Sequence, residues 1–373
     1  MRIAVLAYIV FAILGANTMA SQADSLLAVL KSSKEDSLKV QTYLSLAALY
    51  YRSDPEQAIT YADQARSLAE RIKYPRGLAY AYKSRGMGYY FQGDYREALN
   101  DWELSLNKFR EINYLLGVSN MLNNLGAVYY NYGDNNTGIK YYLESLKVSE
   151  EIGDSLRIAT ALVNIGAVYY SKESTHDLAL EYYSKALPMS EALGDYDAIG
   201  TSAVNMGQIY LDKKDADRAH FYFTKALNAY QKSENGNVAY AMLSLGRVYA
   251  LRKEYEVAVD YQKRAYGLAE SNNARLEMAQ AMLSLGDTYD GMGDVQRSID
   301  SYRRAQELSE EIGASYVLKD SYFGLATAYA KVPDYANAYQ YQLFYNEIKD
   351  TLYNAELDQK IEDFTLIYEI EKQ

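Results

Sequence analysis

Apolar residues recur along this chain at the spacing of an α-helix, and the pattern itself repeats. Within residues 121–130 they fall on one face of a helix, at Leu122, Leu125, Val128 and Tyr129. Nearly the same ten residues return at 161–170, 241–250 and 281–290. A fixed period of about 40 residues predicts a stack of similar helical units, each packed against its neighbours.

A glycine marks the same point in six copies of this pattern. These anchor glycines are Gly86, Gly126, Gly166, Gly207, Gly246 and Gly286, and Ala47 and Ala326 hold the position at the two ends. A tyrosine stands three residues after each anchor, at Tyr50, Tyr89, Tyr129, Tyr169, Tyr210, Tyr249, Tyr289 and Tyr329. The sequence therefore predicts eight copies of one unit.

Each unit is expected to contain a second helix. The first helix is interrupted where Gly, Lys or Pro precedes an Asp that can cap the next helix, at 93–94, 133–134, 214–215, 293–294 and 333–334. An aromatic residue then recurs in the second helix, as Trp102, Tyr142, Tyr183, Phe223 and Tyr302. Because glycine inside a helix costs about 1 kcal/mol relative to alanine, we expect the anchor glycines to allow close packing of the second helix.

These units resemble the tetratricopeptide repeat, which places Leu-Gly and Tyr on its first helix and Ala, an aromatic residue and Ala on its second. The resemblance covers nearly all of residues 21–350. It implies an all-α, right-handed α-solenoid superhelix of about eight helix-turn-helix repeats. Two features depart from the family: the period exceeds the usual value of about 34 residues, and the proline that commonly ends the second helix is mostly absent.

The N-terminal segment differs from the repeats. Residues 1–20 combine Arg2, an apolar run at 3–14 and small residues before Ser21. This pattern predicts a signal peptide that is cleaved after Ala20, and hence an exported chain in the periplasm or another extracytoplasmic space. An uncleaved membrane anchor is the competing interpretation.

The C-terminal segment, residues 351–373, is expected to be helical, with a short heptad seam at Leu357, Ile361, Phe364 and Tyr368. This helix can cap the solenoid or form a coiled-coil linker that pairs with a second copy. Short motifs at 349–352 and 368–369, together with the predicted signal peptide and the long-period repeats, are similar to the extracytoplasmic sensor regions of Bacteroidetes-type membrane receptors. In those receptors a transmembrane helix and a histidine kinase, nucleotide cyclase or DNA-binding domain follow. The chain is then either the sensor half of a receptor or a protein that acts alone.

Composition and charge exclude several kinds of function. The net charge of -11 argues against binding to nucleic acid or to an anionic membrane surface, both of which need clustered Lys and Arg. With no cysteine, the chain has no thiol nucleophile and no disulfide. The two histidines, His176 and His220, lie in different repeats and are interpreted as loop and surface residues. We predict no catalytic residues, no metal site and no cofactor.

Binding to a protein or peptide remains as the predicted function. The family resemblance implies that the first helices line a concave groove. Two residues before the anchor position a polar side chain recurs, as Ser84, Asn124, Asn164, Asn205 and Ser244. Such a ladder can hold the backbone of an extended peptide whatever its sequence, as in some members of the family. Alternatively, these side chains bridge adjacent first helices, because a buried amide or hydroxyl needs a partner.

Tyrosines add a second candidate feature to the predicted groove. One residue after the recurring tyrosine, only the first four copies carry another, at Tyr51, Tyr90, Tyr130 and Tyr170. Tyrosine is favoured at interfaces, so these side chains are predicted to grip the partner, with core packing as the alternative. The sequence thus favours an exported peptide-binding module that is the input region of a receptor. A freestanding periplasmic adaptor or assembly scaffold, and an enzyme carried on a solenoid, are the alternatives.

Overall fold

The computed structural model describes residues 21–131, 133–233 and 237–371, with side chains as far as residue 355. The predicted signal peptide, residues 1–20, lies outside the described residues. Throughout the described ranges the regular structure is helical, without any strand. The predicted all-α fold is confirmed.

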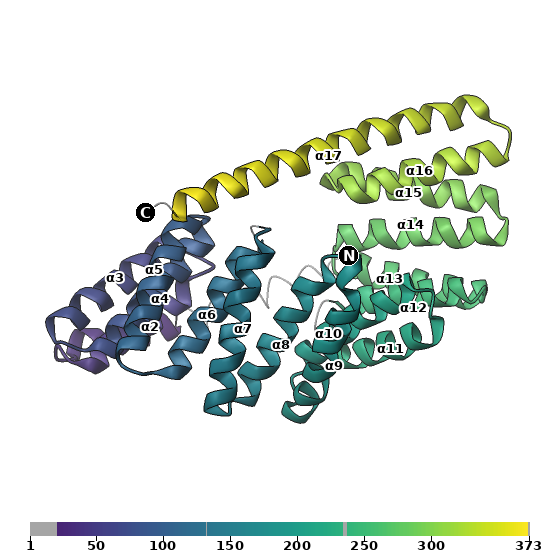
Figure 1. Ribbon diagram of the computed structural model, residues 1–373. Helices are drawn as coiled ribbons and strands as arrows, with labels where there is room; N and C mark the ends of the chain where they lie inside the picture. The colour runs from purple at the N-terminus through teal and green to yellow at the C-terminus, as the bar shows by residue number, and fades with distance from the viewer. Residues whose placement is uncertain (1–20, 132, 234–236, 372–373) are drawn as a thin grey trace. The chain divides into compact units, whose positions relative to one another are not determined.

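Eight helix pairs follow a helical segment at residues 21–32 (Figure 1). The pairs are α2 (Ser37–Tyr50) with α3 (Pro55–Arg71), α4 (Pro75–Gln92) with α5 (Tyr95–Glu111), α6 (Leu115–Asn131) with α7 (Asn135–Ile152), α8 (Ser155–Tyr170) with α9 (His176–Leu193), α10 (Tyr196–Asp212) with α11 (Ala216–Lys232), α12 (Val238–Leu251) with α13 (Tyr255–Ser271), α14 (Arg275–Met292) with α15 (Val295–Ile312), and α16 (Ser315–Lys331) with α17 (Tyr335–Glu371). A short 3-10 turn, Glu173–Thr175, lies between α8 and α9. These pairs are the eight helix-turn-helix copies that the sequence predicts.

The chain divides into two compact units, residues 1–161 and 162–373, and the division falls inside α8. In the N-terminal unit, each helix from α2 to α7 packs against the next, and the first helices α2 and α4 also touch. In the C-terminal unit, successive helices from α9 to α17 pack in the same way, and α10, α12, α14 and α16 contact one another in series. The core of each unit is therefore a row of small clusters between neighbouring helices, as expected for a repeat array.

The anchor glycines lie in tight contact with the second helix of their pair. A Cβ atom added at Gly126 would stand 2.8 Å from the ring of Tyr142 and 3.1 Å from the carbonyl oxygen of Gly138. At Gly86 and Gly286 the nearest ring atom of the second helix would be 2.5 Å away. The partners of the six glycines are Trp102, Tyr142, Tyr183, Phe223, Gln262 and Tyr302 in chain order. The close packing predicted from the glycines is confirmed.

The recurring tyrosine of the first helix stacks on a tyrosine of the second helix in six of the pairs. Ring centroids lie 5.3 to 5.9 Å apart in Tyr50–Tyr61, Tyr129–Tyr141, Tyr169–Tyr182, Tyr210–Tyr222, Tyr249–Tyr261 and Tyr329–Tyr341. Stacked aromatic pairs stabilise a contact by about 0.5–1.5 kcal/mol beyond the area they bury. This second set of tyrosines explains part of the high tyrosine content, and the sequence interpretation did not find it.

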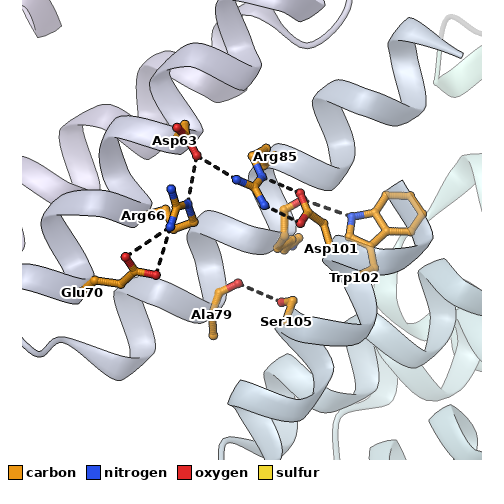
Figure 2. A network of polar contacts seen from close by, with 9 residues as sticks. Asp63, Arg66, Glu70, Ala79, Arg85, Asp101, Trp102 and Ser105 are labelled. Carbon is orange, nitrogen blue, oxygen red and sulfur yellow. Dashed lines mark hydrogen bonds and ion pairs between the residues drawn. The ribbon is translucent and has the colours of Figure 1, made fainter. Parts of the chain in front are cut away.

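The second pair, α4 and α5, has charged side chains in place of this stack (Figure 2). Asp101 occupies the position of the second-helix tyrosine and is 1% exposed. The Arg85 guanidinium donates two hydrogen bonds of 2.7 Å to Asp101 and one of 2.7 Å to Asp63 of α3. The hydrogen bonds to Asp101 raise the pKa of Arg85 above its ordinary value, although burial opposes this. The buried carboxylate of Asp101 is thus paired with a guanidinium that also bonds Asp63.

The turns within the pairs follow the predicted chemistry. Gly93 and Gly293 end α4 and α14 in the left-handed region, with φ of 91° and 80°. Asp134, Asp215, Asp294 and Asp334 accept hydrogen bonds of 3.0–3.2 Å from the backbone amide three residues later. Asp94 precedes α5 without a side-chain capping bond. Between pairs, where proline is scarce, left-handed residues make the turn at Lys73, Asn113, Gly153, Gly194, Asn273 and Gly313.

The last helix, α17, continues from Tyr335 to Glu371 without a break. Its first part packs against α16, with Tyr329 stacked on Tyr341. The side chains of the predicted heptad seam, residues 357–368, lie outside the described side chains. Capping of the array and pairing with a second copy therefore both stay predictions.

Candidate functional site

The N-terminal unit contains a polar pocket of about 190 Å³ that is lined mainly by the first helices α4, α6 and α8, with Ser145 from α7. Its lining consists of Lys83, Ser119, Asn120, Asn123, Asn124, Ser145, Leu156, Arg157 and Thr160. Only one of these side chains, Asn124, belongs to the predicted ladder. We call this site the first-helix pocket.

Helical spacing brings the amide side chains of α6 together. Asn120, Asn123 and Asn124 stand three and four residues apart, so they share one face of the helix. From α8, the Arg157 guanidinium donates a 2.9 Å hydrogen bond to the Asn120 side-chain oxygen and a 2.6 Å bond to Asp154. These two bonds hold the guanidinium in place at the edge of the pocket.

Two basic side chains, Lys83 and Arg157, line the pocket in a chain whose net charge is strongly negative, and Arg157 is paired with Asp154. Burial lowers the pKa of the Lys83 ammonium below its ordinary value, and the positive charge of Arg157 lowers it further. Both effects disfavour the charged form of Lys83. An anionic or strongly electronegative group that entered the pocket would offset both, because it would replace the lost hydration and the like-charge repulsion.

The arrangement is suited to recognising peptide groups. Each asparagine amide can donate and accept a hydrogen bond, which matches the C=O and N–H groups of an extended backbone. Lys83 and Arg157 offer donors without acceptors, so they select carbonyl oxygens or carboxylates. These residues come from three successive first helices, and a ligand along that face would touch all three.

The other ladder residues are engaged within the protein. The Ser84 hydroxyl accepts a 2.8 Å hydrogen bond from Tyr51 of the preceding pair, and the Asn205 amide donates one of 2.9 Å to the Tyr183 hydroxyl. The Ser244 hydroxyl donates to the backbone oxygen of Tyr240 in its own helix. Asn164 is half-buried and interacts with other groups of the chain. The Ser84 bond to Tyr51 joins adjacent first helices, as the bridging alternative expects, whereas Asn205 bonds the second helix α9 of the preceding pair. A peptide-binding role for the ladder stays a prediction.

The predicted tyrosines are half-buried. Tyr90 lies 5.7 Å from the Trp102 ring, and Tyr170 stacks on His176 at 5.4 Å. Burial raises the pKa of the Tyr130 hydroxyl. The rings of Tyr90 and Tyr170 therefore contact the second helix of their own pair, whereas Tyr51 contacts Phe91 and Ser84 of the next pair. A contact of these tyrosines with a partner stays a prediction.

Sequence reasoning missed Lys83, Asn120 and Arg157. A signal for them exists, because they stand three, six and nine residues before the anchor glycines of their helices. These offsets place them on the same side of the first helix, about one turn apart. The prediction considered the position two residues before the anchor and the tyrosines four residues after it, and did not consider these three offsets.

Two other kinds of site were sought among the residues that the structure describes, a metal site and a membrane-spanning helix. There, no group of three or more His, Asp or Glu side chains is placed to hold a metal ion. No helix of that part of the chain combines the length and apolar character needed to cross a membrane. His220 lies 3.0 Å from the Tyr249 hydroxyl and belongs to a different helix pair from His176.

The family is shown by comparison with known sequences. The sequence pattern that defines the tetratricopeptide repeat family matches residues 117–192, 172–232 and 237–311, which together span just over half of the chain. The chain therefore belongs to the tetratricopeptide repeat family. No curated protein sequence matches it significantly.

Several solved structures have a similar fold. The apo form of RapI matches with a TM-score of 0.67 at 15% identity, over 90% of this chain and 99% of that one. The apo quorum sensor NprR from B. thuringiensis gives a TM-score of 0.62 at 16% identity, over 89% and 99%. The Rap conjugation regulator of plasmid pLS20, in complex with a Phr peptide, gives 0.54 at 14% identity, over 91% and 96%. At these identities the likeness establishes the fold.

Proposed function

We propose that this chain is an exported tetratricopeptide repeat module that binds a protein or peptide through its first helices and acts without catalysis. The observation that carries the proposal is the first-helix pocket, in which Lys83, Arg157 and asparagine amides converge. The preferred ligand is an extended segment with a carboxylate placed to reach Lys83. The peptide complex of the structurally similar Rap regulator supports this class of ligand.

The proposal extends to a sensory role. The predicted signal peptide at residues 1–20 supports export. The quorum sensor NprR has a similar fold and supports sensing as a use of such an array. In this proposal the chain is the input region of a receptor, and ligand binding is the signal. A freestanding adaptor would use the same pocket but would be released from the membrane after cleavage near Ala20.

Peptide selection tests the binding proposal. Peptides would be selected from a phage-displayed random library on the purified chain, then labelled with fluorescein and titrated by anisotropy. We expect acidic residues to be enriched among them. Lys83→Met should weaken binding by about 10-fold, and Asn124→Ala by about 5-fold, the value of one hydrogen bond. Asn205 is left unchanged in these variants, because its amide already donates a hydrogen bond to Tyr183.

Lys140→Met is the matched control, since this exposed lysine lies on the second helix α7. It should leave the affinity unchanged. Equal losses in Lys83→Met and Lys140→Met would mean that only overall charge matters, and unchanged binding in both pocket variants would overturn the proposed site.

Cell fractionation tests the location. An antibody to the repeats would be used to follow the native product in soluble envelope and membrane fractions. A membrane-held band much larger than 42.2 kDa would support the receptor. A soluble band slightly below that mass would favour the freestanding adaptor, and a cytoplasmic product would contradict export.

A further inference from the structure

The C-terminal unit carries a second pocket, of about 580 Å³, on helices α9, α10 and α11. Its volume falls within the range of about 300–1,000 Å³ that is usual for small-molecule sites. The buried side chains of Ile199 and Ala229 form part of its lining, and Phe221 and Tyr196 also face it. Most of the lining comes from α11, a second helix, so this site differs from the first-helix pocket.

Phe221 is exceptional within the repeats. It stands two residues before the packed aromatic Phe223, and 57% of it is exposed. At the same position the other pairs with an anchor glycine carry only polar residues, namely Asn100, Lys140, Glu181, Asp260 and Asp300. The repeat fold therefore does not require an apolar side chain here. Phe221 instead adds exposed apolar surface to the lining of the pocket.

Cationic groups accompany both aromatic walls. The Lys225 ammonium lies 5.5 Å from the centroid of the Phe221 ring and forms an ion pair with Glu191. The Lys232 ammonium lies 5.0 Å from the centroid of the Tyr196 ring. Lys225 and Lys232 are seven residues apart, or two turns of α11, so both face the same pocket.

We propose that this pocket binds a small amphipathic anion, whose apolar ring or chain lies between Phe221 and Tyr196 and whose anionic group meets Lys232. Lys225 is already neutralised by Glu191, which leaves Lys232 as the partner for the incoming charge. Apolar burial supplies affinity, and the lysine selects an anion over a neutral molecule of the same shape. This site is independent of peptide binding by the first-helix pocket.

Two fluorescent probes separate these contributions. Anilinonaphthalene sulfonate has an apolar ring system with one anionic group, and phenylnaphthylamine has the same rings without the sulfonate. We expect the purified chain to bind the sulfonate saturably and with one-to-one stoichiometry. Phe221→Asp introduces the residue found at the equivalent positions 260 and 300. This variant should lower the affinity for both probes by about 10-fold or more. Lys232→Met should lower only the affinity for the sulfonate probe, by about 3- to 10-fold.

Phe323→Asp is the matched control, because Phe323 is a comparably exposed phenylalanine of α16 outside this pocket. It should leave both affinities unchanged, and circular dichroism should show unchanged helicity in all three variants. Unaltered binding in Phe221→Asp, or an equal loss in Phe323→Asp, would overturn the site. An equal loss of both probes in Lys232→Met would overturn the assignment of the anion to that lysine.

Discussion

The second and third helix pairs share the same close contact but differ in the space beside it. In the third pair, α6 and α7, Gly126 lies under Tyr142, and Tyr129 stacks on Tyr141 with centroids 5.5 Å apart. In the second pair, α4 and α5, Gly86 lies under Trp102 in the same way. The neighbouring positions there are charged.

The charged pair occupies positions that are apolar or aromatic in the third pair. Arg85 corresponds to Leu125 and Asp101 to Tyr141, and the two bind each other through two hydrogen bonds of 2.7 Å. Both pairs therefore keep the contact between the glycine and its aromatic partner although the positions beside it differ. The positions beside them accept a stacked pair or a matched ion pair, provided that both members are present together.

Breaking the ion pair should give the largest effect. Asp101→Ala removes the carboxylate that accepts two of the hydrogen bonds of Arg85 and leaves the guanidinium with Asp63 alone. Loss of one partner of a buried pair costs about 3–5 kcal/mol. We expect a decrease near the lower end of that range in the free energy of unfolding, measured with urea, because Asp63 remains.

The double variant Arg85→Leu with Asp101→Tyr converts the second pair to the arrangement of the third and is the control for this prediction. It removes both charges together and provides a ring for Tyr89 to stack on. Replacing a buried ion pair by well-packed residues is often neutral or stabilising. We therefore expect the free energy of unfolding of the double variant to lie within about 1 kcal/mol of that of the wild type. A double variant as unstable as Asp101→Ala would show that the charges themselves are required.

Filling the contact that both pairs share should give the next largest effect. In Gly126→Ala the new methyl group would meet the Tyr142 ring at 2.8 Å and the Gly138 oxygen at 3.1 Å, and the backbone atom cannot rotate away. Overpacking of this kind costs about 1–3 kcal/mol. Gly267 of α13 has no atom within 4 Å of an added Cβ, so Gly267→Ala should be neutral or stabilising by up to about 1 kcal/mol. The midpoints of thermal unfolding of the two variants would test this prediction. Equal shifts of the two midpoints would contradict the packing role of Gly126.

The recurrent parts of the fold could be predicted from the sequence, and the exceptions could not. A period of about 40 residues is repeated eight times, and six copies carry the anchor glycine, five of them with an aromatic partner, so each copy supports the interpretation of the others. The Arg85–Asp101 pair occurs in one copy only. Its charges are ordinary in composition, and their burial depends on which helix faces they occupy in three dimensions.

The candidate site shows the same limit. Asn124 was predicted because it belongs to a series along the chain, whereas Lys83 and Arg157 converge on it from two other helices. Their approach depends on the angle between adjacent pairs, which the period does not specify. Phe221 was detectable in the sequence as the one apolar residue among polar equivalents, but its meaning depends on the exposure and on the lysines around it.

The smallest expected effect concerns pH and the outer partner of Arg85. Burial alone would raise the pKa of Asp63, but hydrogen bonds from Arg66 and Arg85 outweigh it and hold this pKa below the ordinary value of 3.8. A depressed carboxyl pKa adds stability that is fully present above the ordinary value and is lost as the pH falls through the folded-state pKa. Because Asp63 is 47% exposed, the contribution should stay below about 1 kcal/mol. Asp63→Asn should therefore lower the urea midpoint slightly near neutral pH, and the gap to the wild type should close as the pH falls below 3.8. A gap that stays constant with pH would mean that the carboxylate acts through packing and that Arg85 relies on Asp101 alone.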